Sequence, residues 1–339
     1  MNETQREKTV KSISIWLQRL VARALIVVAA VVPVSLGVNA QQFPTQDIHL
    51  ICGFPAGSGA DAIVRFYANK LRILSGRTVL VENRPGAGAN IAIEYAARSR
   101  PDGYTILMHG GPGLAANTLM YKKPPIENVN AFQVFATINR QAFMLAVGAD
   151  KPWKTLAELT AAMKAKGEKA TYATSTPTSV VVGAIYKEVA GLQAVDVNYR
   201  TSTDAYNDML SGAVDFGILE PVSTAAAHRQ GKLRILGVST DQRLEAAPDL
   251  PTMIEGGIPG LSMNIWWAAM VPAKTPKAVT EQLSKWFNQV TASEDARKFL
   301  NTFASDPYIL SAEEAQALIN KEVKDWADYI RLAKIEPQG

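Results

Sequence analysis

The chain has only one cysteine, Cys52, among its 339 residues. A lone cysteine excludes an intramolecular disulfide framework and any zinc site built from several cysteines. The three histidines, His49, His109 and His228, lie far apart and lack the spacing of metal ligands. No nucleophile, base and orienting group come together in the sequence either. We therefore expect no metal, no cofactor and no enzymatic activity.

Beyond residue 40, no stretch reaches the roughly 18 consecutive apolar residues typical of a membrane span. The first 40 residues combine five basic side chains, the apolar run 24–37 and the small-residue end Val38-Asn39-Ala40. This order is typical of a secretory signal peptide. We expect export and cleavage after Ala40. The alternative is a membrane anchor, for which the apolar run is short.

The formal net charge of +4 comes largely from this leading segment. Without its five basic and two acidic residues, the remaining basic and acidic side chains nearly balance. A nucleic-acid-binding protein needs a cationic surface, and no such excess remains. We expect no nucleic-acid partner.

Short apolar runs alternate with longer amphipathic segments from residue 48 onward, as at 49–52, 62–74 and 78–82. This alternation predicts an α/β fold with mostly parallel sheets. The length suggests about two domains. Because no low-complexity linker separates them, strands at 143–147 and 264–270 are predicted to cross between them. The predicted division is a signal peptide at 1–40, a discontinuous first domain at 41–141 and 263–339, and a second domain at 142–262.

Local signals predict where several helices begin. Thr155 with Glu158, and Ser311 with Glu314, have the spacing of capping boxes. Thr275 before Pro276 predicts an N-cap followed by proline at the first helical position.

The loop 54–61 joins a predicted strand to a predicted helix. Its Gly57 and Gly59 partly match a dinucleotide-binding fingerprint, although an exported protein meets little dinucleotide. Ser58 lacks the flanking glycines of a hydrolase nucleophile elbow. Glycines and helix N–H groups also suit an anion. A tight turn capped by Asp61 is the plain structural alternative.

Further candidate loops also follow predicted strands, and ligands of open α/β sheets bind beyond such strand ends. They are the segments Val81–Asn90, His109–Gly113, Thr174–Ser179, Asn198–Asp204 and Leu219–Pro221. Arg200 is predicted either to bind a ligand carboxylate in a bidentate pair, or to be solvated or paired within the protein. Glu220 is predicted either to accept a polar ligand group or to pair with Arg200.

The run Glu82-Asn-Arg-Pro-Gly-Ala-Gly88 is the most specific motif, and Pro101-Asp-Gly-Tyr104, Gly212-x-Val-Asp215 and Pro248-x-Leu-Pro-Thr252 accompany it. These landmarks extend over essentially the whole mature chain and resemble those of the periplasmic solute receptors of tripartite tricarboxylate transporters, the Bug receptors. The resemblance implies a two-domain periplasmic binding fold of type II, with a cleft that closes on its ligand like a Venus flytrap. It also implies a monomeric receptor that captures a small organic carboxylate and delivers it to the membrane subunits of the transporter. The alternative is an exported sensor input domain or, less favoured, a Rossmann-type enzyme.

The resemblance and the loops together give the candidate ligand-binding residues. They are Phe54, Pro55, Ala56, Gly57, Ser58, Gly59, Ala60, Asp61, Gly111, Pro112, Gly113, Thr174, Ser175, Thr176, Thr178, Ser179, Tyr199, Arg200, Thr201 and Glu220. The sequence departs from the family pattern at 218–220, where Ile-Leu-Glu replaces the usual Phe-Asp-Asn. Loss of that aspartate argues against an amino acid, whereas Arg200 and the added hydroxyls favour a dicarboxylate, aliphatic or aromatic.

Overall fold

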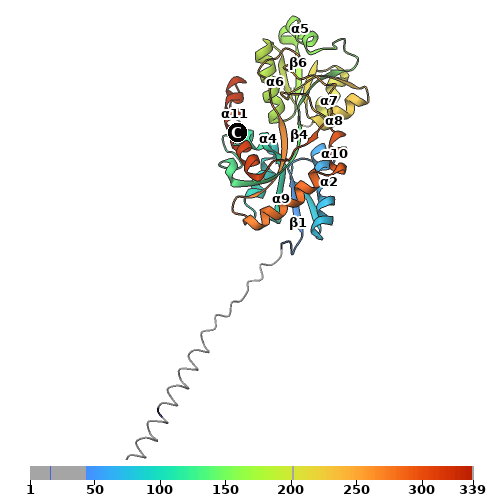
Figure 1. Ribbon diagram of the computed structural model, residues 1–339. Coiled ribbons are helices and arrows are strands. Elements are labelled where there is room, and N and C mark those ends of the chain that lie inside the picture. Colours follow the sequence, from blue (N-terminus) through green and yellow to red (C-terminus); the bar gives the residue numbers. More distant parts are fainter. Residues whose placement is uncertain (1–15, 17–42, 201, 338–339) are drawn as a thin grey trace, which may run out of the picture. The chain divides into compact units, whose positions relative to one another are not determined.

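The computed structural model describes residues 16, 43–200 and 202–337 (Figure 1). The chain divides into residues 1–43 and 44–339, and the fold described here belongs to the second unit. The expected signal peptide and its cleavage site lie outside the described residues, except for Trp16. Within the described part of the chain, no helix is both long enough and apolar enough to cross a membrane.

Two β-sheets form the framework of this unit. The first has the strand order β11-β4-β10-β3-β1-β2, and the second has the order β7-β6-β8-β5-β9. The strands of the first sheet are β1 (Ile48–Cys52), β2 (Val79–Asn83), β3 (Thr105–Gly110), β4 (Phe132–Gln141), β10 (Ile265–Pro272) and β11 (Asp306–Pro307). Those of the second are β5 (Met144–Gly148), β6 (Thr171–Thr174), β7 (Val195–Asn198), β8 (Phe216–Leu219) and β9 (Leu233–Val238).

Helices cover both sheets, and each sheet with its helices is called a lobe below. The first lobe carries α2 (Gly59–Ser75), α3 (Asn90–Ala97), α4 (Gly111–Asn117), α9 (Lys277–Thr291), α10 (Glu294–Asn301) and α11 (Ala312–Leu332), with the 3₁₀ turns η1 (Ala87–Ala89) and η2 (Val129–Ala131). The second lobe carries α5 (Leu156–Lys166), α6 (Pro177–Ala190), α7 (Ser202–Ser211), α8 (Pro221–Arg229) and the turn η3 (Gly167–Lys169).

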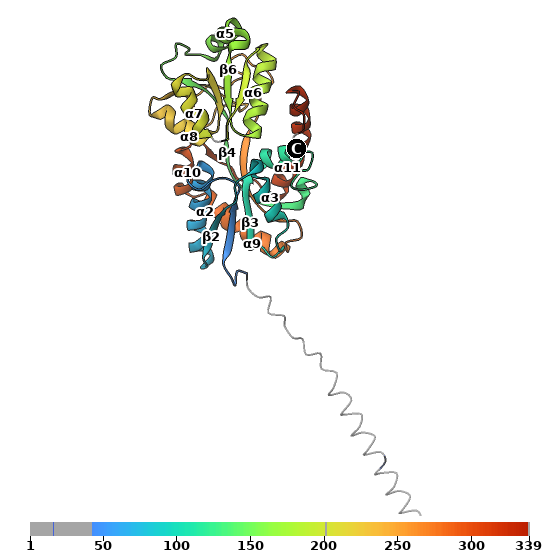
Figure 2. The same cartoon turned by 180° about the vertical axis from the view of Figure 1, so that it is seen from behind.

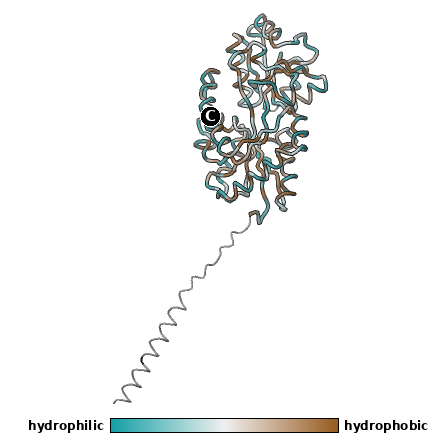
Figure 3. The backbone as a smooth tube through the Cα atoms, in the orientation of Figure 1, coloured by the Kyte–Doolittle hydropathy of each residue, from teal (hydrophilic) through white to brown (hydrophobic). Residues whose placement is uncertain are grey.

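The hydrophobic core runs from one lobe into the other. Helices α2 and α9 pack on one face of the first sheet, and α3, α4 and α11 on the other (Figure 1 and Figure 2). On that second side, α4 and α11 also lie against α6, so Leu114, Ile319 and Ile185 belong to one buried cluster. Hydrophobic residues follow the strands, and hydrophilic residues alternate with them along the helices (Figure 3). The predicted alternation of strands and helices along the chain is also present.

Strand direction is mixed, and the prediction of mostly parallel sheets is wrong. Strand β1 pairs in parallel with β2 and β3, and β6 pairs in parallel with β7 and β8. Strand β10, however, is antiparallel to β3 and β4, and β5 is antiparallel to β8 and β9. The antiparallel pairs involve the strands next to the crossings between the lobes. Their direction is not visible in the sequence, because buried strands read as apolar runs in either orientation.

The chain passes from the first sheet to the second between Gln141 and Met144 and returns between Val238 and Ile265. Ser239 ties the two passages together. It is fully buried; its hydroxyl accepts the N–H of Phe143 (3.0 Å) and donates to the carbonyl of Met263 (2.8 Å). Backbone bonds from Ser239 to Phe143 and from Met263 to Ser239 complete the connection. The two crossings therefore form one hydrogen-bonded connecting segment.

Most predicted helix starts are confirmed, and one is wrong. Ser311 and Glu314 form the predicted reciprocal capping box of α11. Thr155 is the N-cap of α5, but the predicted box is incomplete there, because Glu158 accepts the N–H of Lys154 (2.7 Å) and not that of Thr155. At α9 the N-cap is Pro276, while the Thr275 hydroxyl donates to the carbonyl of Pro272 (2.7 Å). Thr275 therefore closes the preceding turn and does not cap the helix.

Candidate ligand-binding site

Asp61 fixes the shape of the first candidate loop. Only 3% of it is exposed, and its carboxylate accepts the N–H of Gly57 (2.8 Å), Nδ2 of Asn83 (2.9 Å) and Nε of Arg65 (2.8 Å). Burial alone would raise the pKa of Asp61, but these hydrogen bonds outweigh it and hold the pKa below its usual value. Ser58 is the N-cap of α2, so the interpretation of Asp61 as the capping residue is wrong.

The first turn of α2 presents open backbone donors. Pro55, Ala56 and Gly57 are exposed, whereas Ser58, Gly59 and Ala60 are half-buried. Among the described residues, the N–H groups of Gly59 and Ala60 have no hydrogen-bond partner. Helix N-termini carry a partial positive charge, and unpaired N–H groups there bind anions.

The second candidate segment is a helix rather than a loop. Strand β3 ends at Gly110, and α4 begins at once, with Gly111 and Pro112 buried in its first turn and Gly113 half-buried. Gly111 is required there because a Cβ would lie 2.2 Å from the indole ring of Trp266. This helix could not be predicted from the sequence, because glycine and proline normally indicate a loop.

His109 begins one of the candidate segments without being a predicted ligand-binding residue, yet its position is unusual. Its ring stacks on Phe54 (centroids 5.7 Å apart) and lies edge-on to Trp267 (6.1 Å). The residue is 3% exposed, and neither ring nitrogen has a partner among the described residues. Burial lowers its pKa to about 4, so the imidazole is neutral near pH 7. A buried polar group without a partner is rare, so the position of His109 is not explained by the hydrogen bonds of the fold alone.

The hydroxyl-rich segment of the second lobe is largely occupied by its own hydrogen bonds. Thr174 Oγ1 donates to Asp196 Oδ1 (2.8 Å). Thr176 and the fully buried Ser179 form a capping box at the start of α6, and Ser179 Oγ also accepts the N–H of Ser175 (3.0 Å). Thr178 is buried. These hydroxyls shape the start of α6 before any ligand is considered.

The remaining candidates lie at the starts of α7 and α8. Tyr199 donates its hydroxyl to Asp208 (2.6 Å), and burial together with this bond raises its pKa to about 12. Arg200 is exposed, and Thr201 lies outside the described residues. Glu220 is the N-cap of α8, and within the described part of the chain it makes no ion pair with Arg200. The expectation of an Arg200–Glu220 pair is therefore not met, because the Glu220 carboxylate is bound by the start of its own helix.

The two lobes meet at these helix starts. A Cβ on Gly59 would lie 2.4 Å from Cβ of Val222, in the first turn of α8. A Cβ on Gly88 would lie 3.5 Å from Pro177, the first residue of α6. The starts of α2 and α8 thus approach each other directly, and the Glu82–Gly88 motif approaches α6. Sequence reasoning missed Val222, because nothing local connects it to Gly59.

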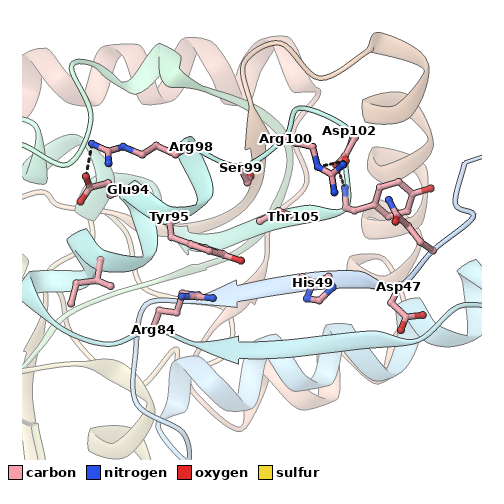
Figure 4. Close-up of a pocket in the computed structure, with 13 residues that line it drawn as sticks. Asp47, His49, Arg84, Glu94, Tyr95, Arg98, Ser99, Arg100, Asp102 and Thr105 are labelled. Atoms are coloured by element: carbon pink, nitrogen blue, oxygen red, sulfur yellow. Dashed lines mark hydrogen bonds and ion pairs between the residues drawn. The ribbon is translucent and has the colours of Figure 1, made fainter.

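A separate open groove of about 1050 Å³ lies beside β1, β3 and α3 (Figure 4). Most of its charged side chains are paired. Arg98 binds Glu94 (2.6 Å), Arg100 lies 3.8 Å from Asp102, and Arg84 binds Glu82 (2.7 Å) while stacking on Tyr95. The starts of β1 and β3, α3 with the loop after it, and Arg84 just beyond the end of β2 supply these residues. The residues at the start of α2 do not line this groove.

The described residues contain no group of three or more His, Cys, Asp or Glu side chains placed to hold a metal ion.

Comparison with known proteins identifies the family. Residues 63–335 match the model of the tripartite tricarboxylate transporter family receptor, and the chain belongs to that family. Its members are substrate-binding receptors and not enzymes, so the dinucleotide interpretation of Gly57 and Gly59 does not apply.

Individual relatives agree with this assignment. A UPF0065 protein of Bordetella bronchiseptica is 29% identical over 327 residues, covering 95% of each chain. The structure of R. palustris Rpa4515 with adipate is similar with a TM-score of 0.81 and 25% identity, covering 87% of this chain and all of that one. The periplasmic binding protein BugD gives a TM-score of 0.78 and 27% identity over the same shares. The two-domain binding-protein fold and the Bug resemblance are therefore confirmed.

Proposed function

We propose that this receptor is exported to the periplasm, binds a small organic acid between its lobes and delivers it to the membrane subunits of a tripartite transporter. The observation that supports this most directly is the pair of open N–H groups at Gly59 and Ala60, on the helix start that meets the second lobe at Val222. Unpaired donors on a positive helix end suit a carboxylate. The adipate complex of the similar protein Rpa4515 fits the same ligand class.

Closure of the lobes would complete the site. We propose that the lobes correspond to residues 41–141 with 263–339 and to residues 142–262, and that they hinge at the segment tied by Ser239. Hinge closure around a ligand needs only a few residues to change their dihedral angles. The receptor is proposed to act as a monomer in this cycle.

The experiment is calorimetric titration of the mature protein with a panel of organic acids, beginning with adipate, against matched alcohols that lack a carboxylate. Ala60→Pro removes one of the two open donors at a helix position where proline is tolerated. A charge-assisted hydrogen bond contributes about 1.5–3 kcal/mol, so the variant should bind roughly 10- to 100-fold more weakly.

Glu313→Pro is the matched control, since it places proline at the second position after the N-cap of α11, as Ala60→Pro does in α2. It should bind like the wild type. Equal affinities in Ala60→Pro and the wild type would refute the α2 carboxylate site, and no binding of any acid by folded protein would refute the proposed function itself.

A further inference from the structure

The start of α8 differs from the start of α2 in one respect: its backbone donors are already filled by a carboxylate of the chain itself. Glu220 Oε2 accepts the N–H of Val222 (2.9 Å). Its Oε1 accepts the N–H of Ser223 (3.1 Å) and the Ser223 hydroxyl (2.6 Å). The anion-binding capacity of this helix end is therefore satisfied internally, whereas Gly59 and Ala60 in α2 remain open.

The Glu220 carboxylate also lies beside the α2 site. Val222, whose N–H holds Oε2, is the residue that packs against Gly59. The open donors of the first lobe and the fixed carboxylate of the second thus belong to two helix starts that face each other. A ligand whose carboxylate binds at α2 presents its other end toward α8.

The charge on Glu220 is not neutralised by a neighbouring cation. Glu220 is half-buried, and within the described residues no lysine, arginine or histidine forms an ion pair with it. Its oxygens accept hydrogen bonds from uncharged donors, and a carboxylate has lone pairs left for further donors. A second ligand carboxylate near it would meet a like charge, whereas a hydroxyl, amide or ammonium group would find an acceptor.

On the basis of the proposed function, we propose that Glu220 determines specificity: it disfavours a second carboxylate at the far end of the ligand and favours a distal hydrogen-bond donor. The substrate class is then a small monocarboxylic acid with a hydroxyl, amide or ammonium group at its other end. This substrate class replaces the dicarboxylate that was expected from Arg200. Arg200 itself is exposed, beyond the end of β7.

The test is a set of matched pairs of equal chain length: 4-hydroxybutyrate with succinate, 5-hydroxypentanoate with glutarate, and 6-hydroxyhexanoate with adipate. Calorimetry on the wild type should give at least tenfold tighter binding of the hydroxy acid in the pair whose length fits. Glu220→Gln keeps an acceptor oxygen for the α8 N–H groups but removes the charge, and should reduce that preference about tenfold or reverse it. Glu220→Asp keeps the charge and should retain the preference.

Glu314→Gln is the control, because Glu314 also caps a helix through its carboxylate but belongs to α11. It should leave the ratio unchanged. A wild type that prefers the dicarboxylate, or a ratio that Glu220→Gln leaves unaltered while acids still bind, would overturn the role of Glu220 and spare the proposed function. Absence of binding to every acid would instead refute the proposed function.

Discussion

Glu322 makes the stability of this receptor depend on pH in a direction opposite to that of most carboxylates. It lies on α11, is 9% exposed, and accepts the indole N–H of Trp266 on β10 (3.2 Å). Burial raises the pKa of Glu322 from its ordinary 4.5 to about 7, and nearby Asp325 adds to the shift. The folded protein therefore holds a proton that the unfolded chain releases near pH 4.5.

The sign follows from linkage between proton binding and folding. Between pH 4.5 and about 7 the folded state binds more protons at Glu322, so the free energy of unfolding falls as pH rises. Each pH unit in this window costs about 1.4 kcal/mol, and the loss levels off above pH 7 at roughly 3 kcal/mol. Below pH 4.5 the contribution is fully retained.

Glu322→Gln removes the ionisation and keeps an oxygen that can accept the Trp266 N–H. The variant should match the wild type near pH 4.5 and exceed its unfolding free energy by about 1–3 kcal/mol at pH 8. Urea unfolding at several pH values measures this difference, and subtraction from the wild type cancels other titrating groups. Glu313→Gln, at an exposed position of the same helix, should show no such difference. A Glu322→Gln variant with the pH profile of the wild type, or one less stable at pH 8, would refute the reasoning.

Further predictions concern the site. His109→Leu should remove an acid-dependent loss of stability, because the buried imidazole must remain neutral as pH falls from 6.5 to about 4; identical pH profiles in urea unfolding would contradict this. Asp61→Asn should lower the unfolding free energy by about 1–3 kcal/mol at pH 7. It should destabilise more than Arg65→Gln, because Arg65→Gln removes only one of the three hydrogen bonds on Asp61. Equal urea midpoints for the two variants would contradict this. Gly59→Ala should weaken acid binding about tenfold and enlarge the bound form in X-ray scattering, since its methyl group would lie 2.4 Å from Cβ of Val222. Adding Val222→Ala should restore binding, and failure of that rescue would argue against a contact between the lobes.

Much of the fold could be predicted because short apolar runs alternate with amphipathic segments along the chain. The predicted runs 49–52 and 78–82 lie within one residue of β1 and β2, and the segment 62–74 lies within α2. Strand direction could not be predicted, because the pairing of β10 with β3 and β4 joins segments far apart in the chain. The first turn of α4 also escaped prediction, since Gly111 is there to accommodate Trp266 and not to form a turn.

The site was harder to predict because the same residue types cap helices and bind anions. The sequence placed Thr176, Ser179 and Glu220 at strand ends, but the structure uses all three to satisfy helix starts. Conversely, the open backbone N–H of Gly59 could not be predicted as a binding group, because no side chain marks it. The orphan nitrogens of His109 depend on burial by Phe54 and Trp267, which only the folded chain provides.

In the proposed function, the helix starts of the two lobes contribute differently to ligand recognition. Among the described residues, the N–H groups of Gly59 and Ala60 at the start of α2 have no partner. In the second lobe, Thr176 and Ser179 cap α6, and Glu220 caps α8. An acid group gains most where donors are unpaired, so the first lobe is suited to hold the carboxylate that all ligands of such a receptor would share. The second lobe presents side-chain oxygens already fixed in place, and fixed acceptors discriminate by what they repel as well as by what they bind. Substitutions around Gly59 should therefore change affinity for every acid, whereas substitutions at Glu220 should change which acid is chosen.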